Sequence, residues 1–206
     1  EKCCRALDAA AELGSPVWTG VIYAKWLDLP NGLLTREVKA RMWDRAVDSL
    51  QVLCTYARAL GIDICIEIVN RFEAYMINTA DDGLRFAADV GAENLKLLLD
   101  AFHMNIEEDS LIDAITASGS RLGHFHVGEA NRKPPRPGRM PWSEIGKALK
   151  KIGYDGCVVM EPFVVPGGSV GRDVHVWRNL FPELSADYLD KQAADSVKYL
   201  REQFEV

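Results

Sequence analysis

The chain has 206 residues, of which 48% are hydrophobic and 26% charged, which indicates one soluble globular domain with a sizeable core and excludes a disordered polypeptide. Its net charge of −6, with Lys and Arg scattered along the sequence, argues against a nucleic-acid partner. No apolar segment approaches the roughly 20 residues that span a bilayer, and the N-terminus has no apolar signal-peptide core, so we expect no membrane partner and a cytoplasmic location.

Helix-like and strand-like segments alternate from the start of the chain. Residues 2–12 have helical character, and the segment VWTGVIY (17–23) follows as the first strand candidate. Apolar residues then recur at helical spacing from Thr35 to Leu60. This pattern predicts a long amphipathic helix with Thr35 as its N-cap and Gly61 at its end.

Four short apolar runs follow, with helical sequence between them. They read IDICIE (62–67), NLKLLLD (94–100), LGHFH (122–126) and GCVVME (156–161). Each is rich in leucine or in β-branched residues and is short enough for a buried strand.

Capping signatures locate the helices between these runs. Thr79 with Asp82 predicts a helix that extends to about residue 90, and Asn105 with Glu108 predicts the start of the next one. Two more helices are expected at about 142–152 and 185–204.

The repeated order of strand, loop and helix predicts a parallel sheet covered by helices. Alternation alone fits either a barrel or an open doubly wound sheet. The four apolar runs, however, each end in a residue of metal-ligand type, namely Glu67, Asp100, His126 and Glu161. An open sheet concentrates ligand contacts at one switch point, whereas a barrel collects them at one rim from successive strands. We therefore predict an α/β chain of the (β/α)8 TIM-barrel type.

Three carboxylates and one imidazole form an oxygen-rich set that suits Mn²⁺, Mg²⁺ or Co²⁺ better than structural zinc or copper. Without an ion, the three carboxylates would repel one another and be driven towards protonation. Each residue also has an ordinary structural interpretation when taken alone. Glu67 could pair with Arg71, Asp100 could cap a helix and His126 could be a core histidine, while Glu161 could belong to an ion pair that faces a helix. The coincidence of four strand ends favours a metal site.

The five cysteines show no paired zinc-type spacing, which indicates reduced, structural thiols. Cys3 and Cys4 could be metal ligands, but two small side chains at the start of a helix are the better interpretation. Cys65 and Cys157 fall inside strand-like runs, and Cys54 lies in the long helix.

Five motifs contain or follow the four strand ends: EIVNRFE, LDAFHMNIEED, GHFHVGEANR, GRMPW and MEPFV. In order and spacing they closely resemble the ketose 3-epimerase family, the group of D-tagatose 3-epimerase and D-psicose (D-allulose) 3-epimerase, within the xylose-isomerase-like barrel superfamily. The resemblance extends over essentially the whole chain. It implies eight-stranded barrels for complete members, of which this chain resembles strands four to eight, with the N-terminal part missing. We expect a fragment of a longer gene product, the alternative being a reduced domain that protects its sheet edges by association.

The resemblance also implies roles for individual residues. Glu67 and Glu161 resemble the two glutamates that bind the metal and act as acid and base, and Asp100 and His126 resemble the other two metal ligands. The residues that resemble substrate-binding positions are Glu73, His103 and Arg132, which would hold ketose oxygens near C1 to C3, and Trp26, which would form an aromatic wall. Trp26 fits plain core packing equally well.

The implied reaction is metal-dependent C3 epimerisation of free ketohexoses (D-tagatose/D-sorbose, D-fructose/D-psicose), with Mn²⁺ as the first choice of metal and Co²⁺ or Mg²⁺ as alternatives. Inversion at C3 requires a proton to leave on one face and another to return on the opposite face. Two carboxylates could alternate as base and acid through a cis-enediolate, while the ion offsets the charge on O2. The resemblance further implies a homo-oligomer, a dimer or tetramer, for the full-length form.

Three other functions compete with this one. A hydroxypyruvate-type aldose–ketose isomerase of the same superfamily could share the two glutamates. A non-catalytic metal-binding or sugar-binding fragment is possible because part of the pocket would be absent. The endonuclease branch is disfavoured, since a site with several zinc ions needs many histidines and this chain has four.

Overall fold

The computed structural model describes residues 1–27 and 29–204 of the chain. Five parallel strands form one sheet in sequential order: β1 (Val17–Gly20), β2 (Asp63–Ile68), β3 (Leu95–Asp100), β4 (Leu122–Val127) and β5 (Val158–Met160). The helices are α1 (Lys2–Glu12), α2 (Arg36–Ala59), α3 (Ala80–Val90), α4 (Ala101–Glu107), α5 (Leu111–Ser118), α6 (Trp142–Lys151), α7 (Gly168–Asp173) and α8 (Ala186–Phe204), with a 3-10 turn at Gly119–Arg121.

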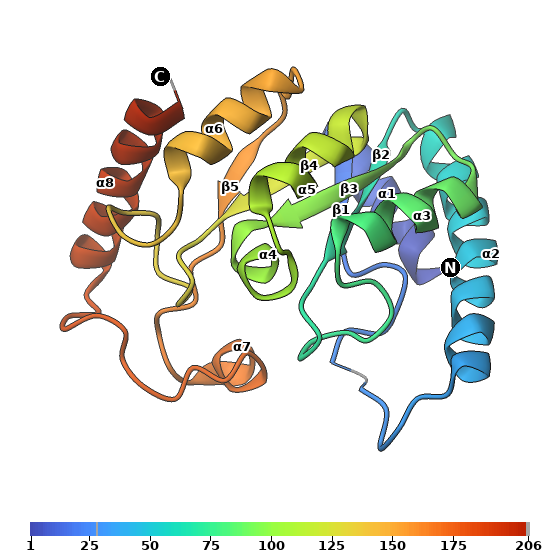
Figure 1. The fold of residues 1–206 in the computed structure, drawn as a ribbon, viewed down its shortest axis with the longest axis horizontal. Coiled ribbons are helices and arrows are strands. Elements are labelled where there is room, and N and C mark those ends of the chain that lie inside the picture. The colour runs from blue at the N-terminus through green and yellow to red at the C-terminus, as the bar shows by residue number, and fades with distance from the viewer. Residues whose placement is uncertain (28, 205–206) are drawn as a thin grey trace.

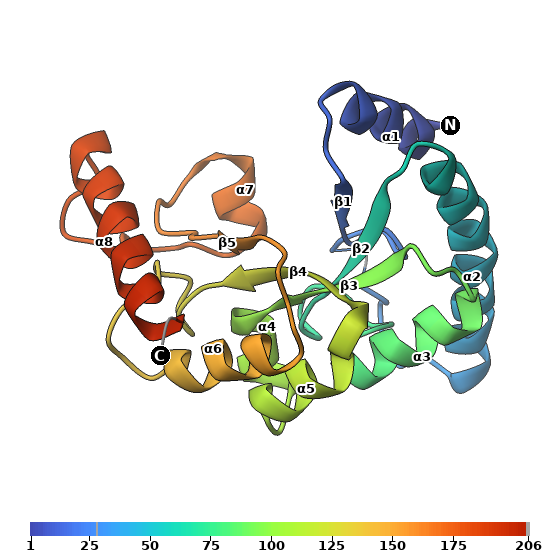
Figure 2. The same ribbon diagram turned by 90° about the horizontal axis from the view of Figure 1, so that it is seen from above.

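The sheet is curved, and most helices pack around its outer side (Figures 1 and 2). Helices α1, α2, α3, α5, α6 and α8 contact one another in that order. Helix α4 directly follows the end of β3, and α7 lies in the lower part of the molecule in Figure 1. The parallel strands therefore form a half-barrel, which confirms the prediction of a TIM-barrel type chain with five of the strands.

The near-continuous apolar sequence of the central strands follows from burial on both sides. Strand β3 is buried along its length apart from the partly exposed Lys96, and Ile66, Leu97 and Phe125 are fully buried. Helix α3 approaches the sheet closely at Gly83, where an added Cβ would lie 2.8 Å from Ile68 Cδ1. This packing fixes the strands whose ends carry the predicted ligands.

The sequence predicted the ends of most helices and strands to within a few residues. The side chain of Thr35 accepts a hydrogen bond from Val38 N and caps α2, and Thr79 accepts one from Asp82 N and caps α3. Strand β1 ends at Gly20, earlier than the predicted residue 23. The cause is a tight turn in which Gly20 adopts φ +140° and its carbonyl accepts a hydrogen bond from Ile22 N at 2.9 Å.

One predicted helix start was wrong. Asn105 does not start a helix, because it lies inside α4, whose N-cap is Asp100. The next helix, α5, is capped by Ser110, whose Oγ accepts from Asp113 N at 3.2 Å, and Glu108 instead accepts a hydrogen bond from Ala80 N. The structure also has a short helix, α7, over the segment GSVGRD, where the sequence predicted no helix.

All five cysteines lie in the described part of the chain and are free thiols. Cys65 is buried in β2, whereas Cys157 is exposed and precedes β5. Within residues 1–27 and 29–204, no helix is both long and apolar enough to cross a bilayer.

Candidate metal centre

The four predicted ligands lie at the C-terminal ends of four neighbouring strands. Glu67 is the penultimate residue of β2, Asp100 ends β3, His126 is the penultimate residue of β4, and Glu161 directly follows β5. Asp100 and His126 are also register partners. One donor atom from each of the four side chains lies within 4.8 Å of the others.

His126 provides the clearest sign that these atoms face a common centre. Its Nδ1 lies 3.8 Å from Glu67 Oε1, 3.8 Å from Asp100 Oδ2 and 3.7 Å from Glu161 Oε2. These separations are too long for hydrogen bonds. The nitrogen is buried and has no hydrogen-bond partner among the described residues, which is costly unless another group binds it. A nitrogen and three carboxylate oxygens around one point fit a divalent cation.

The electrostatics of the cluster follow from burial and from the closeness of like charges. Burial, followed by the negative charge of Glu161, raises the pKa of Glu67 to about 7. Burial also opposes protonation of His126, but the carboxylates of Asp100, Glu161 and Glu67 outweigh it and raise the pKa of the ring to about 9. The cluster therefore attracts positive charge, whether a proton or a metal ion.

Asp100 combines a structural contact and a site contact in one carboxylate. Its Oδ1 accepts a hydrogen bond from Phe102 N at 2.7 Å, which caps α4. Its Oδ2 lies 2.6 Å from Arg132 Nη1 and faces His126. Burial opposes ionisation of Asp100, yet His126 and Arg132 hold its pKa well below the usual range.

Arg132 reaches the cluster from the loop after β4. Its Nη1 also contacts Glu161 Oε2 at 3.3 Å, and its guanidinium stacks over Phe102 at 4.0 Å and Phe163 at 5.1 Å. Stacking and ion pairing together fix the planar group in one orientation. Arg71, the alternative partner considered for Glu67, instead forms an ion pair with Glu107 at 2.7 Å.

His103 lies beside the cluster and is oriented by Asn70. The backbone N–H of Asn70 donates to His103 Nδ1 at 3.2 Å. The other ring nitrogen, Nε2, lies 3.9 Å from Glu67 Oε1 and 3.0 Å from Arg132 Nη2, which can only donate, so donor groups face both ring nitrogens. Burial lowers the pKa of His103, which favours the neutral ring.

Glu73 and Trp26 meet on the other side of the same space. Trp26 Nε1 donates to Glu73 Oε2 at 2.9 Å, and Asn70 Nδ2 donates to Glu73 Oε1 at 3.4 Å. Trp26 is 38% exposed, which argues against a plain core role. The four predicted substrate-binding residues line one cavity of about 280 Å³ together with two carboxylates of the candidate metal site: Trp26, Glu73, His103, Arg132, Glu67 and Glu161. Their roles stay predictions.

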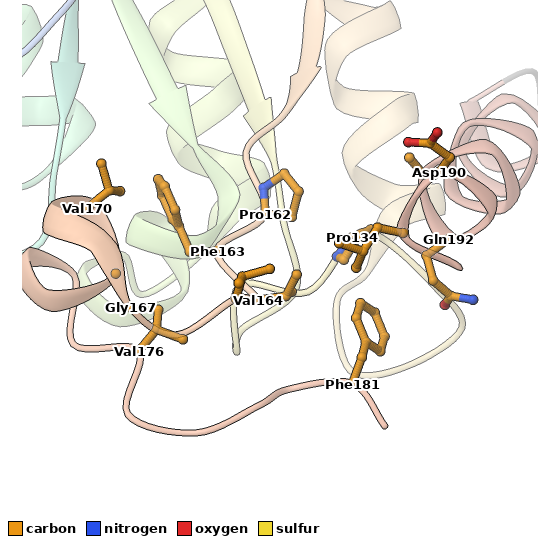
Figure 3. Close-up of a pocket in the computed structure, with 14 residues that line it drawn as sticks. Pro134, Pro162, Phe163, Val164, Gly167, Val170, Val176, Phe181, Asp190 and Gln192 are labelled. Atoms are coloured by element: carbon orange, nitrogen blue, oxygen red, sulfur yellow. The ribbon is translucent and has the colours of Figure 1, made fainter. Parts of the chain in front are cut away.

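A larger cavity of about 450 Å³, shown in Figure 3, shares Phe163 with the first one. Its lining is mainly apolar, and among its described lining residues the polar side chains are Asp190 and Gln192. Volume alone would favour this cavity over the smaller one as the functional site. The smaller cavity is the better candidate because polar groups and side chains with shifted pKa values converge on it.

Sequence reasoning missed two buried polar residues near the cluster. Asn70, 2% exposed, holds both His103 and Glu73, and Glu129, 6% exposed, lies in the loop that carries Arg132. Both stand three residues after a predicted ligand, within the quoted motifs EIVNRFE and GHFHVGEANR. That position after a strand end was an available signal.

The comparisons with known proteins agree with this geometry. The family model described as "Xylose isomerase-like TIM barrel" matches residues 1–203. A D-psicose 3-epimerase of Agrobacterium fabrum is 44% identical over 197 residues, which is 96% of this chain and 67% of the relative. A D-psicose 3-epimerase of Ruminiclostridium cellulolyticum is 47% identical over 182 residues, which is 88% of this chain and 61% of the relative.

A solved structure gives the same result in three dimensions. The D-psicose 3-epimerase from Clostridium cellulolyticum H10, described with D-tagatose, superimposes with a TM-score of 0.93 at 42% identity, covering 98% of this chain and 69% of that one. The chain belongs to the ketose 3-epimerase family. This member of the family spans 61 to 67% of the length of the two curated relatives named above.

Proposed function

We propose that the four clustered side chains bind one divalent metal ion, with Mn²⁺ as the first candidate and Co²⁺ or Mg²⁺ as the others. The observation that carries this proposal is the buried Nδ1 of His126. It faces carboxylate oxygens of Glu67, Asp100 and Glu161 at 3.7 to 3.8 Å and has no hydrogen-bond partner within the described residues. Hard oxygen donors with one imidazole suit these ions.

For the protein as a whole we propose C3 epimerisation of free ketohexoses, interconverting D-fructose with D-psicose or D-tagatose with D-sorbose. Support comes from the family relationship and from two solved relatives that are described with D-tagatose and with D-fructose. A cavity of about 280 Å³ suits a small polar ligand, since it lies just below the range of roughly 300–1,000 Å³ of drug-sized sites.

Two glutamates would carry the proton transfers. A bound divalent ion would supply Lewis-acid stabilisation of the negative charge that develops on O2 of the sugar. Glu67 on β2 and Glu161 after β5 are separated by β3 and β4, so they approach the cavity from different sides. One would remove the C3 proton and the other would return a proton to the opposite face of a cis-enediolate.

The neighbouring side chains would orient the sugar. Glu73, His103 and Arg132 line the cavity and would hold oxygens near C1 to C3. The indole of Trp26 would form a wall for the carbon skeleton, held in place by its hydrogen bond to Glu73. Fixing the substrate in this way contributes to the rate by reducing the entropy lost on reaction.

The test is hydrogen exchange at C3. Mn²⁺-loaded protein is incubated with D-fructose, D-psicose or D-tagatose in D₂O, and deuterium at C3 is measured by NMR. We expect incorporation at C3 together with appearance of the C3 epimer. Retention of all protium at C3 by the loaded protein would refute the reaction. Turnover of hydroxypyruvate instead of ketohexoses would favour the aldose–ketose isomerase, and binding of metal and sugar without exchange would favour a non-catalytic fragment.

We propose that residues 1–206 act as one partial barrel domain, that the full-length form is a dimer or tetramer, and that it works in the cytoplasm. Light scattering on the purified protein tests the assembly, and fractionation of cells tests the location.

A further inference from the structure

The loop at residues 128–141 joins β4 to α6 and carries Arg132 into the metal centre. It contains three prolines between Lys133 and Gly138, which cannot donate backbone hydrogen bonds, so the loop has fewer backbone donors that could fix its shape. One carboxylate, that of Glu129, is buried beneath it and is 6% exposed. A buried carboxylate is costly unless hydrogen bonds satisfy it.

Glu129 ties the middle and the end of this loop together. Its Oε1 accepts a hydrogen bond from Trp142 Nε1 at 2.8 Å and another from Arg136 N at 3.0 Å. Trp142 is the first residue of α6 and is 1% exposed, so it is a rigid anchor. The absence of a side chain at Gly138 also matters here, because a Cβ at that position would lie 3.3 Å from Glu129 Oε2.

The backbone of Glu129 fixes Arg132 directly. Glu129 O accepts a hydrogen bond from Arg132 N at 2.8 Å, and Glu129 N donates to Lys133 O at 2.9 Å, which closes a tight turn. Within this turn Arg132 adopts φ +61°, a left-handed conformation that a residue with a side chain adopts only when its surroundings enforce it.

We propose that Glu129 is a positioning residue that holds Arg132 against Asp100 and Glu161. The inference rests on the proposed function in that it assigns Arg132 to the working site. Without the two hydrogen bonds to Glu129 Oε1, the turn would lose its anchor to α6 and Arg132 would relax from its left-handed conformation. Its guanidinium would then leave Asp100 Oδ2, which now lies 2.6 Å away.

The main experiment measures Mn²⁺ binding by calorimetry, without reference to turnover. Arg132 places a positive charge in contact with two metal ligands, so Arg132→Ala should tighten Mn²⁺ binding by about threefold to tenfold. Glu129→Ala should shift the dissociation constant in the same direction, because it releases Arg132. The double variant should show no more than the Arg132→Ala effect, since the two residues act in series.

Conservative variants distinguish the hydrogen-bonding role of Glu129 from the effect of its negative charge. Glu129→Gln removes the charge but keeps an oxygen that can accept both hydrogen bonds, so its dissociation constant should stay within about twofold of the parent value. Glu129→Asp keeps the charge but retracts the oxygen, and should resemble Glu129→Ala in part. Glu108→Ala is the matched control, because Glu108 also accepts a backbone hydrogen bond, from Ala80 N, but does not contact the loop of Arg132.

Limited trypsin digestion provides a second measurement, which does not need metal. Arg132 and Arg139 are the cleavable sites in the loop, since Lys133 and Arg136 precede prolines. Cleavage at these sites should be about tenfold faster in Glu129→Ala than in Glu108→Ala, because it reports the population of the opened loop. Unchanged Mn²⁺ affinity in Glu129→Ala, or additive effects in the double variant, would overturn the proposal. If the parent chain binds no Mn²⁺, the proposed function fails, and digestion alone decides whether Glu129 holds the loop.

Discussion

Arg132 Nη1 lies 2.6 Å from Asp100 Oδ2, the oxygen that also faces His126 across the centre of the cluster. A fixed positive charge thus contacts a carboxylate that we assign to a divalent cation. Arg132 partly offsets the repulsion among Asp100, Glu161 and Glu67, and it lowers the pKa of Asp100. The site is therefore held together by this chain's own charges, and an added ion strengthens an arrangement that already exists.

Metal binding should stabilise the folded chain measurably. Saturating Mn²⁺ at about 100 times its dissociation constant contributes about 2.7 kcal/mol. For a domain of this size that corresponds to a rise in Tm of roughly 5–10 °C, at about 2–4 °C per kcal/mol. Differential scanning calorimetry with and without Mn²⁺ measures the shift, and EDTA should reverse it.

A matched pair of variants tests whether the shift comes from this cluster. Asp100→Asn removes a ligand charge and should abolish most of the Mn²⁺-dependent rise in Tm. Asp48→Asn, an exposed position on α2, should leave it unchanged. An equal Mn²⁺ response in both variants would mean that the ion binds elsewhere.

Each of the two glutamates should exchange a proton with a different face of C3 of the sugar. With excess Mn²⁺ present, Glu67→Gln should still exchange the C3 hydrogen of one epimer with D₂O and lose exchange of the other, because one base remains. Glu161→Gln should show the opposite preference. Loss of either group should lower epimerisation by about 10²- to 10⁴-fold, the usual contribution of general acid–base groups. Equal exchange of both epimers in either variant would argue for a single base.

The cluster of four candidate ligands was predictable because its signal is local. Each of Glu67, Asp100, His126 and Glu161 ends an apolar run, and parallel strands place such ends at one rim. The contacts of Asn70 and Glu129 were not predictable in the same way, since they depend on which distant atoms a loop brings near. His103 and Trp142, their partners, lie 33 and 13 residues further along the chain.

Errors in the predicted elements have a similar cause. Asn105 and Glu108 match a capping signature, yet Asp100 already starts a helix there because its carboxylate caps α4 while facing the metal centre. The cap at Asp100 lies upstream of the signature formed by Asn105 and Glu108, so the helix starts earlier than the signature predicts. Helix α7 was missed because its glycine-rich sequence, GSVGRD, favours turns when considered alone.

The observed caps predict a clear difference in stability. Ser110→Ala removes the hydrogen bond from Asp113 N to Ser110 Oγ and should lower the free energy of unfolding by about 1 kcal/mol. Asn105→Ala, an exposed position inside α4, should change it by less than about 0.5 kcal/mol. Urea unfolding followed by circular dichroism measures both. A larger loss of unfolding free energy in Asn105→Ala than in Ser110→Ala would mean that Asn105 caps a helix, as the sequence signature predicted.

The close packing of three strands predicts that Gly123 tolerates no side chain. A Cβ on Gly123 in β4 would lie 2.6 Å from Lys96 Cβ in β3 and 2.7 Å from Cys65 Sγ in β2. Since Lys96 Cβ cannot move without its strand, Gly123→Ala should lower the free energy of unfolding by about 1–3 kcal/mol. Gly128→Ala is the control, because a Cβ there meets no atom of the described residues within 4 Å. Adding Cys65→Ala to Gly123→Ala should recover only part of the loss, since the contact with Lys96 remains, and full recovery would show that the strands separate more easily than this packing implies.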